Sequence, residues 1–257
     1  MFMKPFDGGA WRGVSMIRDE GELRRSYDES GEMLMHLQAS VDNFEVFARA
    51  LTIGPETMVM NFRPELPMHE RYAVSYDFLT PQMGAETATI AQTVNAFFRW
   101  EFNSCETIVK DGVAYPIDYA NASPDVALTS LHYYFPWAIT ALVRWSAFCA
   151  VTKRPMTIDQ NARDYFEIGD REDLTYEEKL AQYGRLADDY FSVDAYAEFC
   201  AQHLPQLDEL VHAYFSSPEF DDLLVQTVVS TFPQHEHEHF VAHYRGLLAA
   251  WARDNAA

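Results

Sequence analysis

The chain has 257 residues, enough for one large domain or two smaller ones, and 48% of them are apolar. This composition excludes a largely disordered chain, because it offers enough apolar surface for a packed core. The formal net charge of −20 at pH 7 disfavours sequence-independent binding to nucleic acids and to anionic membranes, whose phosphates repel an acidic surface.

The cysteines point to a reducing compartment. Cys105, Cys149 and Cys200 are scattered without paired spacing, which argues against a disulfide framework or a zinc knuckle. No secretory signal pattern opens the sequence. The most apolar run, 138–151, is shorter than a membrane span and contains Arg144, so we interpret it as a buried helix. We therefore expect a cytoplasmic protein.

The first part of the chain has the pattern of short strands, turns and one or two helices. Helical spacing is found at 20–33, and β-like runs follow at 33–41 and 46–53. The apolar-periodic segment 87–95 predicts a helix that leads into a strand at 97–108.

The second part is predicted to be helical. Thr175, with Glu178 three residues later, has the pattern of a capping box at a helix start. Apolar residues recur at helical spacing in the segments 128–151, 176–190, 193–203, 207–215, 220–232 and 237–252. We therefore predict an α+β fold in which an antiparallel sheet with helices, residues 1–124, precedes an acidic all-helical domain, residues 125–257.

A lysine and a glycine-rich loop open the chain. Lys4 stands at the end of the first predicted strand, and Gly8, Gly9 and Gly13 follow it. Glycines let backbone N–H groups close around phosphate oxygens, and a lysine supplies the charge. An ordinary turn is an equally compatible alternative for this motif.

Arg49 lies in a predicted strand among apolar residues. Regular strand alternation places its side chain on the same face as Phe47 and Leu51. An arginine on such a face needs an anionic partner, because an unpaired buried charge costs several kcal/mol. A salt bridge to a carboxylate and contact with a nucleotide phosphate both remain open.

The strongest local signal is a predicted hairpin with its turn at Asp111-Gly112. Folding the chain there returns Asp118 towards Glu106, and Asn121 follows shortly after. Two carboxylates and an amide oxygen form a hard-oxygen set that suits Mg²⁺. The alternative is an acidic hairpin whose side chains are simply solvated.

Taken in order, these elements resemble the ATP-grasp superfamily: a Lys-Pro and glycine loop, a strand ending in glutamine, an arginine strand ending in Ile-Gly, and an Asp-Gly hairpin followed by acid, asparagine and proline. The resemblance covers residues 1–124. Members of this superfamily join a carboxylate to an amine or another nucleophile through an acyl-phosphate, with Mg-ATP bound between two α+β subdomains. The resemblance implies an ATP-grasp-type antiparallel sheet.

The resemblance also implies roles for individual residues. It implies that Lys4 contacts the ATP phosphates under a loop containing Gly8, Gly9 and Gly13. Arg49 would face the triphosphate and the acyl-phosphate, and Glu106, Asp118 and Asn121 would bind magnesium. The adenine hinge would run from Gln38 to Val41, with Asp42 or Glu45 as a ribose contact.

Two departures from the family pattern stand out. Two residues, Tyr119 and Ala120, separate the last acid from the asparagine where the family has one, so a bulge or a different ligand pair is expected. Glu101 and Asn103 are that alternative pair. The family also places a substrate domain ahead of the segment that begins at Lys4, so we expect a missing amino-terminal segment or a homo-oligomer.

A histidine-rich segment opens the last predicted helix. His235, His239 and His243 recur every four residues, a spacing that can bind zinc. Because Phe240 rather than a glutamate follows His239, a metalloprotease site is not indicated. We favour a solvated, pH-sensitive helix start over a metal site.

An aromatic stripe precedes these helices. We interpret it as core packing, with a wall of the ATP cleft as the alternative. Its members are Tyr133, Tyr134, Phe135, Trp137 and Trp145.

The leading functional hypothesis is an ATP-dependent ligase, or its carboxy-terminal fragment, that uses ATP and Mg²⁺ to join a small-molecule carboxylate to an amine. A non-catalytic ATP-grasp remnant that serves as a binding or assembly module is the first alternative. An ATP-dependent kinase is the second, because the same phosphate-binding groups serve both reactions.

Overall fold

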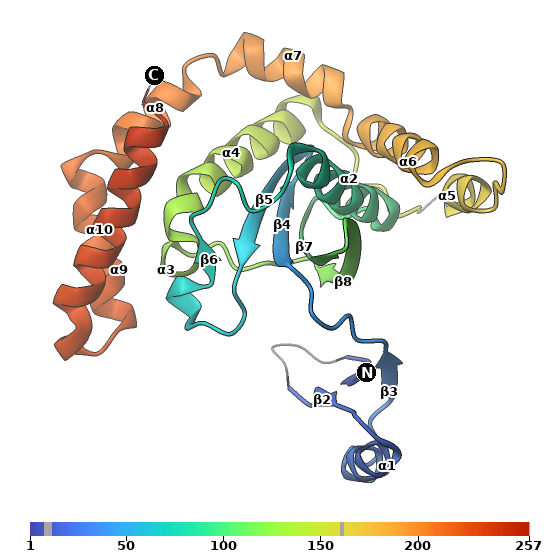
Figure 1. Cartoon of the computed structure of the whole chain (residues 1–257). Coiled ribbons are helices and arrows are strands. Elements are labelled where there is room, and N and C mark those ends of the chain that lie inside the picture. Colours follow the sequence, from blue (N-terminus) through green and yellow to red (C-terminus); the bar gives the residue numbers. More distant parts are fainter. Residues whose placement is uncertain (8–11, 160–161, 257) are drawn as a thin grey trace. The chain divides into compact units, whose positions relative to one another are not determined.

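The computed structural model describes residues 1–7, 12–159 and 162–256, and the chain forms two compact units, Met1–Phe44 and Glu45–Ala257. Both contain an antiparallel sheet with helical segments, so the predicted α+β class is confirmed (Figure 1). The boundary between the units lies at Phe44. The position 124, expected to divide sheet from helices, therefore falls inside the second unit.

The first unit is a small sheet with one helix. Strand β1 (Phe2–Pro5) lies between β2 (Ser15–Met16) and β3 (Met35–Gln38), antiparallel to both. Helix α1 (Glu20–Glu29) begins at Asp19, whose carboxylate accepts a hydrogen bond from the Glu22 N–H at 2.8 Å. The helix ends four residues before the predicted Met33, in a turn that continues to β3.

The second unit is built on a five-stranded antiparallel sheet in the order β6-β5-β4-β7-β8. Its strands are β4 (Val46–Ile53), β5 (Glu56–Phe62), β6 (Tyr72–Ala73), β7 (Phe102–Lys110) and β8 (Val113–Asn121), with the short 3₁₀ helix η1 (Met68–Glu70) between β5 and β6. The predicted hairpin joins β7 to β8. Asp111 and Gly112 at its tip have φ of 51° and 73°, which matches the left-handed pair of a tight hairpin turn.

Helix α2 (Pro81–Phe98) covers one face of this sheet and contacts β4, β5, β7 and β8 (Figure 1). The contact is made by small side chains, Ala91 of the helix against Ala50 and Cys105 of the sheet, which lets the helix approach closely. The helix continues to Phe98 and ends at Arg99 in the left-handed conformation. Strand β7 therefore begins at Phe102 rather than at residue 97.

The helix predicted over 128–151 is interrupted. It forms α3 (Leu128–Leu131), the 3₁₀ turn η2 (His132–Tyr134) and α4 (Phe135–Thr152). His132 has φ 38° and ψ −102°, outside the helical region. Pro136 sits in the first turn of α4, where its missing N–H is harmless, whereas inside a continuous helix it would break the hydrogen bond to residue 132.

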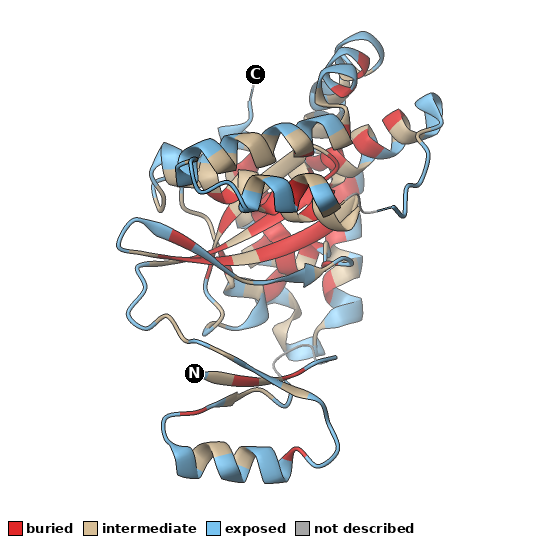
Figure 2. Ribbon diagram, turned by 90° about the vertical axis from the view of Figure 1, so that its right-hand side faces the viewer, coloured by how far each residue is buried: buried red, intermediate tan, exposed pale blue. Residues whose placement is uncertain are grey.

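Five of the remaining helices follow the predicted segments closely: α6 (Tyr176–Phe191), α7 (Val193–His203), α8 (Leu207–Phe215), α9 (Pro218–Thr231) and α10 (His237–Asp254). Helix α5 (Ala162–Gly169) and the 3₁₀ helix η3 (Gln234–Glu236) were not predicted. The capping box at Thr175 and Glu178 is present in both directions. Helix α6 packs on α2, α4 contacts α7 and α8, and α9 pairs with α10. Figure 2 shows buried residues on the strands and on one side of most helices.

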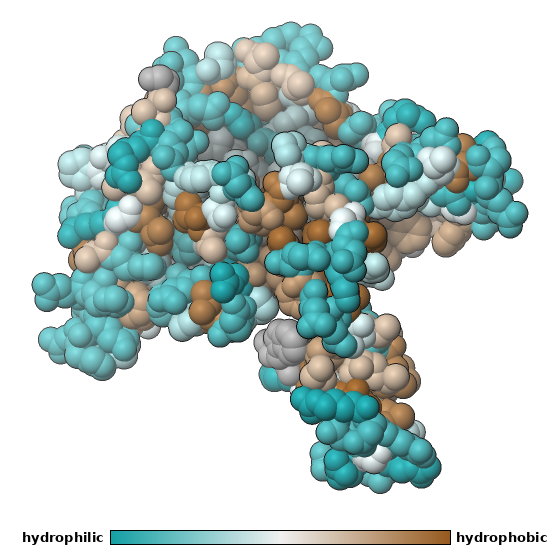
Figure 3. Space-filling model, in the orientation of Figure 1, coloured by the Kyte–Doolittle hydropathy of each residue, from teal (hydrophilic) through white to brown (hydrophobic). Residues whose placement is uncertain are grey.

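On the face shown in Figure 3, hydrophilic residues cover most of the periphery of the second unit, and apolar residues gather near its centre. Within the described residues, one helical stretch, Leu128–Thr152, is long and apolar enough to cross a membrane by length and composition. Ala138, Ala141, Trp145 and Phe148 of this stretch are buried within the unit. Tyr133 and Tyr134 of the aromatic stripe are buried as well.

Candidate functional site

Three charged residues form a row across adjacent strands of the second unit. Arg49 of β4 is in register with Glu106 of β7, and Glu106 is in register with Asp118 of β8. Residues in register share a face of an antiparallel sheet. Because Ala50 and Cys105 face α2, this row lies on the opposite face.

Ser104 links this row to Asn121. Its hydroxyl oxygen accepts hydrogen bonds from Arg49 Nε at 3.3 Å and Nη2 at 3.1 Å, and from Asn121 Nδ2 at 2.9 Å. The Arg49 guanidinium also forms an ion pair with Glu106, Nη1 to Oε1 at 3.7 Å. One buried hydroxyl thus holds both the arginine and the amide on the same sheet face.

A β-bulge brings Asp118 and Asn121 to the same face. Ser104 and Glu106 are two residues apart, whereas their partners, Asn121 and Asp118, are three apart, and the register shifts between them. In a regular strand, residues three apart would point to opposite faces. The extra residue of β8 reverses this alternation, so the bulge expected from the unusual spacing is present.

The row lies beside apolar and aromatic side chains. The Arg49 guanidinium stacks over the Phe62 ring, 5.0 Å from its centroid. Tyr72 lies next to this ring and is buried. Burial raises the pKa of the Tyr72 hydroxyl, and the nearby positive charge of Arg49 partly opposes that change. The row of charged residues therefore crosses a sheet face that also carries buried aromatic side chains.

The exposure of the row increases towards the edge of the sheet. The side chains of Arg49 and Glu106 are 18% and 19% exposed, whereas Asp118 on the edge strand is exposed. A ligand can therefore reach the row from the β8 side. The described residues contain no group of three or more His, Cys, Asp or Glu side chains that could hold a metal ion, so an amide or a ligand must complete any cation site here.

The other residues expected to bind nucleotide lie mainly in the first unit. Lys4 lies in β1, opposite His36 of β3. Gly13 has φ 71°, and a Cβ there would lie 2.8 Å from Pro5 Cγ, so this turn requires glycine. Gln38 ends β3, as predicted.

Further predicted nucleotide contacts follow Gln38 or fall in the opening loop. Val41 and Asp42 lie in the segment after β3. Gly8 and Gly9 lie outside the described residues.

Glu45 has a local structural contact. Its carboxylate accepts hydrogen bonds from the backbone N–H of Asp111 at 3.1 Å and 3.2 Å. It thereby caps the turn of the β7–β8 hairpin.

The alternative ligand pair, Glu101 and Asn103, is engaged elsewhere. Asn103 is buried: its amide nitrogen donates to Asn95 Oδ1 at 2.8 Å and its oxygen accepts from the Asn121 N–H at 2.9 Å. Glu101 accepts a hydrogen bond from the Tyr190 hydroxyl at 2.7 Å and lies 3.7 Å from Arg154 Nε. Both residues support packing of the helices and the bulged strand.

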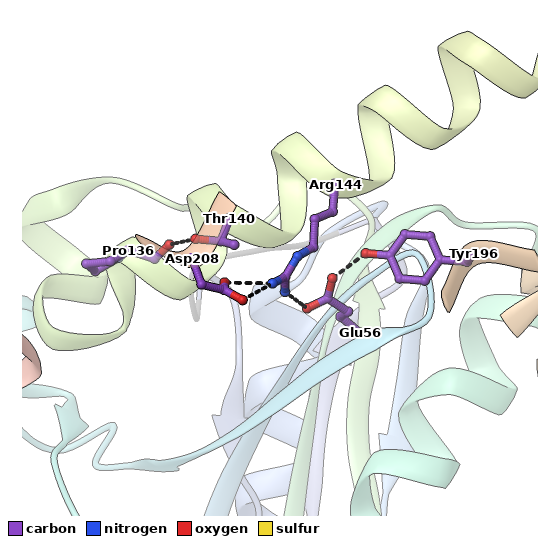
Figure 4. Close-up of polar contacts among 6 residues, drawn as sticks. All are labelled: Glu56, Pro136, Thr140, Arg144, Tyr196 and Asp208. Atoms are coloured by element: carbon purple, nitrogen blue, oxygen red, sulfur yellow. Dashed lines mark hydrogen bonds and ion pairs between the residues drawn. The ribbon is translucent and has the colours of Figure 1, made fainter. Parts of the chain in front are cut away.

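A second polar network joins the sheet to the helices (Figure 4). Arg144 of α4 binds Glu56 of β5 at 3.3 Å and Asp208 of α8 at 2.6 Å. The Tyr196 hydroxyl of α7 donates to the other oxygen of Glu56. Four elements meet at this network, which makes it a structural link between the sheet and helices α4, α7 and α8.

Sequence reasoning did not single out Ser104 or Tyr72. Ser104 could have been found from its position two residues before Glu106, which places both on one face of the strand. Tyr72 comes from a two-residue strand that no periodicity predicts. Comparison with known proteins adds no assignment: no family model, no curated protein and no solved structure matches this chain.

Proposed function

We propose that the chain binds Mg-ATP and uses it to join a small-molecule carboxylate to an amine through an acyl-phosphate, as the ATP-grasp superfamily it resembles does. One observation carries the proposal: Arg49, Ser104, Glu106, Asp118 and Asn121 converge on one face of the β4-β7-β8 sheet. The free thiols of the described cysteines fit action in a reducing cytoplasm.

The charges of the row favour a cation–anion complex over either ion alone. An anion at Arg49 lies near Glu106, which is one strand spacing, about 4.8 Å, from the arginine strand. A cation at Glu106 and Asp118 lies equally near the Arg49 guanidinium. An anion alone is therefore repelled by Glu106, and a cation alone is repelled by Arg49. When both ions are bound as a pair, each of them faces a residue of opposite charge. Magnesium bound to a triphosphate has this paired character.

The donor set fits magnesium. Mg²⁺ is usually held by one or two carboxylates together with substrate phosphates, and Glu106 and Asp118 supply the carboxylates. The Asn121 amide donates through Nδ2 to Ser104, which leaves its oxygen for a cation. Magnesium held there would neutralise charge on the phosphates and orient them.

The chain's own residues would bind and position the reactants. Arg49 would hold the transferring phosphoryl group. In the first unit, the family resemblance alone assigns a phosphate contact to Lys4 and a nucleoside contact to the segment from Gln38 to Asp42. A substrate carboxylate oxygen then bonds to the γ-phosphorus as ADP leaves, and the amine nitrogen displaces phosphate from the carbonyl carbon.

A specific observation favours a non-catalytic ATP-binding module as the second candidate. Arg49 and Glu106 already neutralise each other at 3.7 Å, so the row can also serve as a polar layer of the sheet. A kinase is the third candidate, because a hydroxyl acceptor could replace the carboxylate.

The binding step is tested with a variant that keeps the fold. Asp118→Asn removes an exposed charge from the proposed magnesium site, and Asp111→Asn removes the same charge from the tip of the same hairpin. Mg-ATP at about 100 times its Kd should raise the Tm of the wild type and of Asp111→Asn by about 5–10 °C. We expect less than half that shift for Asp118→Asn. An equal shift in all three proteins, or none in the wild type, rejects the site.

The chemical step is tested separately. Hydroxylamine supplied with a panel of carboxylates traps acyl-phosphates as hydroxamates. ADP release that requires both a carboxylate and hydroxylamine supports the ligase. ADP release with polyol acceptors alone supports the kinase, and a Tm shift without any ADP release supports the binding module.

A further inference from the structure

Helix α10 packs against η2, α9 and η3, largely through aromatic rings. Phe240, Tyr244, Leu248 and Trp251 form its buried stripe. The Tyr244 hydroxyl donates to the Thr129 carbonyl at 3.0 Å. Near the amino-terminal end of the helix, histidine rings take part in this contact as well.

Three histidines from distant parts of the sequence meet at this end. His243 of α10 lies with its ring centroid 5.8 Å from that of His69 in η1 and 6.4 Å from that of His132 in η2. His69 also packs edge-on against Phe240, with centroids 4.8 Å apart. The imidazoles thus form part of the surface that holds α10 in place.

The geometry of this cluster favours neutral imidazoles at His132 and His243. His132 is 2% exposed, and its Nδ1 accepts a hydrogen bond from the Tyr133 N–H at 2.8 Å, so Nδ1 carries no proton. His243 Nε2 is buried and makes no hydrogen bond to the described part of the chain. A proton on that nitrogen would place a positive charge among buried rings, which is costly.

The charged and titratable groups around the cluster come from each packed element. Glu70 of η1 lies 3.6 Å from His69 Nε2, and His239 of α10 stacks near His243. Tyr72 of β6 lies edge-on to His132. The cluster therefore contains several imidazoles close together, and Glu70 supplies a carboxylate next to one of them.

Burial is the main cause that lowers the pKa of His132, to about 4, and it also lowers the pKa of His243. The charges of neighbouring histidines act in the same direction, while a hydrogen bond to the His69 backbone and, more weakly, the Glu70 carboxylate raise the pKa of His243. A depressed histidine pKa means that the docked helix binds fewer protons than the released one. The docked state is therefore fully stable above the ordinary pKa of 6.5 and loses stability as pH falls from 6.5 towards 4.

We propose that His69, His132 and His243 form an acid-sensitive latch that holds the amino-terminal half of α10 on η1 and η2, and that acidification releases it. Each proton taken up on release raises the open population about tenfold per pH unit between the two pKa values. Because His132 also contacts Tyr72, release changes the surroundings of the ring beside Arg49.

The test is hydrogen exchange of the whole chain at pH 7.5 and pH 5.0, corrected for intrinsic exchange rates, with EDTA present to exclude metals. We expect protection of residues 237–247 to fall at least tenfold at pH 5.0. Protection of α6, whose residues include no histidine, should stay within twofold. A fall of equal size in both segments, or no fall in 237–247, overturns the latch.

Variants assign the effect to the cluster. The double variant His69→Gln and His243→Gln should show less than half of the pH-dependent loss of protection, since it removes the His243 imidazole, whose pKa burial lowers, together with the His69 ring that packs against it. His235→Gln, whose side chain is 80% exposed in η3, should behave as the wild type. His69→Gln alone serves if the double variant does not fold. A pH dependence unchanged in the cluster variants overturns the proposal.

Discussion

Gly54 is the position where a single methyl group should most disturb the second unit. It lies in the turn between β4 and β5 with φ 55°, and an added Cβ would lie 2.3 Å from Trp145 Cδ2 and 2.5 Å from Cε3. Trp145 cannot move away easily, because it packs against Phe148, Phe191 and Tyr196 at centroid distances of 5.4–5.9 Å. The methyl group must therefore displace either the turn or helix α4.

The cost has two parts. A non-glycine residue in the left-handed region costs about 1–2 kcal/mol, and overpacking in a rigid core costs about 1–3 kcal/mol more. Gly54→Ala should therefore lose about 2–5 kcal/mol. Gly112→Ala is the matched control, because Gly112 has φ 73° and no atom within 4 Å of its would-be Cβ, which leaves the backbone cost alone.

Urea unfolding of the full chain, followed by circular dichroism and by tryptophan fluorescence, measures both variants. We expect Gly54→Ala to be less stable than Gly112→Ala by about 1–3 kcal/mol, the steric part of the cost. Equal losses would mean that Trp145 does not press on the turn. Helix α4 would then dock on the sheet without bringing the Trp145 ring against Gly54.

Two further substitutions test local interactions. Ser104→Ala removes the acceptor shared by Arg49 and Asn121, so we expect the free energy of unfolding in urea to fall by about 1–3 kcal/mol. We also expect Mg-ATP to raise the Tm of this variant less than that of the wild type. An unchanged Tm shift would show that Ser104 does not position the proposed ligands. Thr175→Ala removes the side-chain cap of α6, whose hydroxyl accepts a hydrogen bond from the Glu178 N–H at 3.2 Å. We expect the variant to lose about 1 kcal/mol of stability and to show reduced hydrogen-exchange protection in the first turn of α6. Unchanged protection in that turn would contradict the role of Thr175 as the cap.

Local signals account for most of what the sequence could predict. The Asp111-Gly112 turn depends on two adjacent residues that tolerate positive φ, so the β7–β8 hairpin was predictable without any tertiary information. The same holds for the capping box at Thr175. Helical spacing located the helices of the carboxy-terminal half because each buries one stripe of apolar residues.

Features that depend on neighbours across the fold were less accessible. The unusual spacing of Asp118 and Asn121 allowed either a bulge or another ligand pair, and only the register with Ser104 and Glu106 decides for the bulge. The break at His132 was missed because apolar periodicity continues through residues 128–151 while the backbone does not. Pro136 was the local signal that could have predicted this break.

The candidate site follows the same division. Arg49 and Glu106 face each other through strand pairing alone, whereas regular pairing from the hairpin turn would place Ile117 opposite Glu106. Asp118 takes that place only through the register shift between Glu106 and Thr107, which the hairpin turn does not predict. Sequence alone could not assign the state of the arginine, because a salt bridge and a phosphate contact require the same side chain on the same face. The structure shows the salt bridge, in which Arg49 Nη1 lies 3.7 Å from Glu106 Oε1. A phosphate contact is compatible with this salt bridge, because a ligand that carries both a cation and an anion can bind Glu106 and Arg49 in turn. Neither residue is then left as an unpaired buried charge.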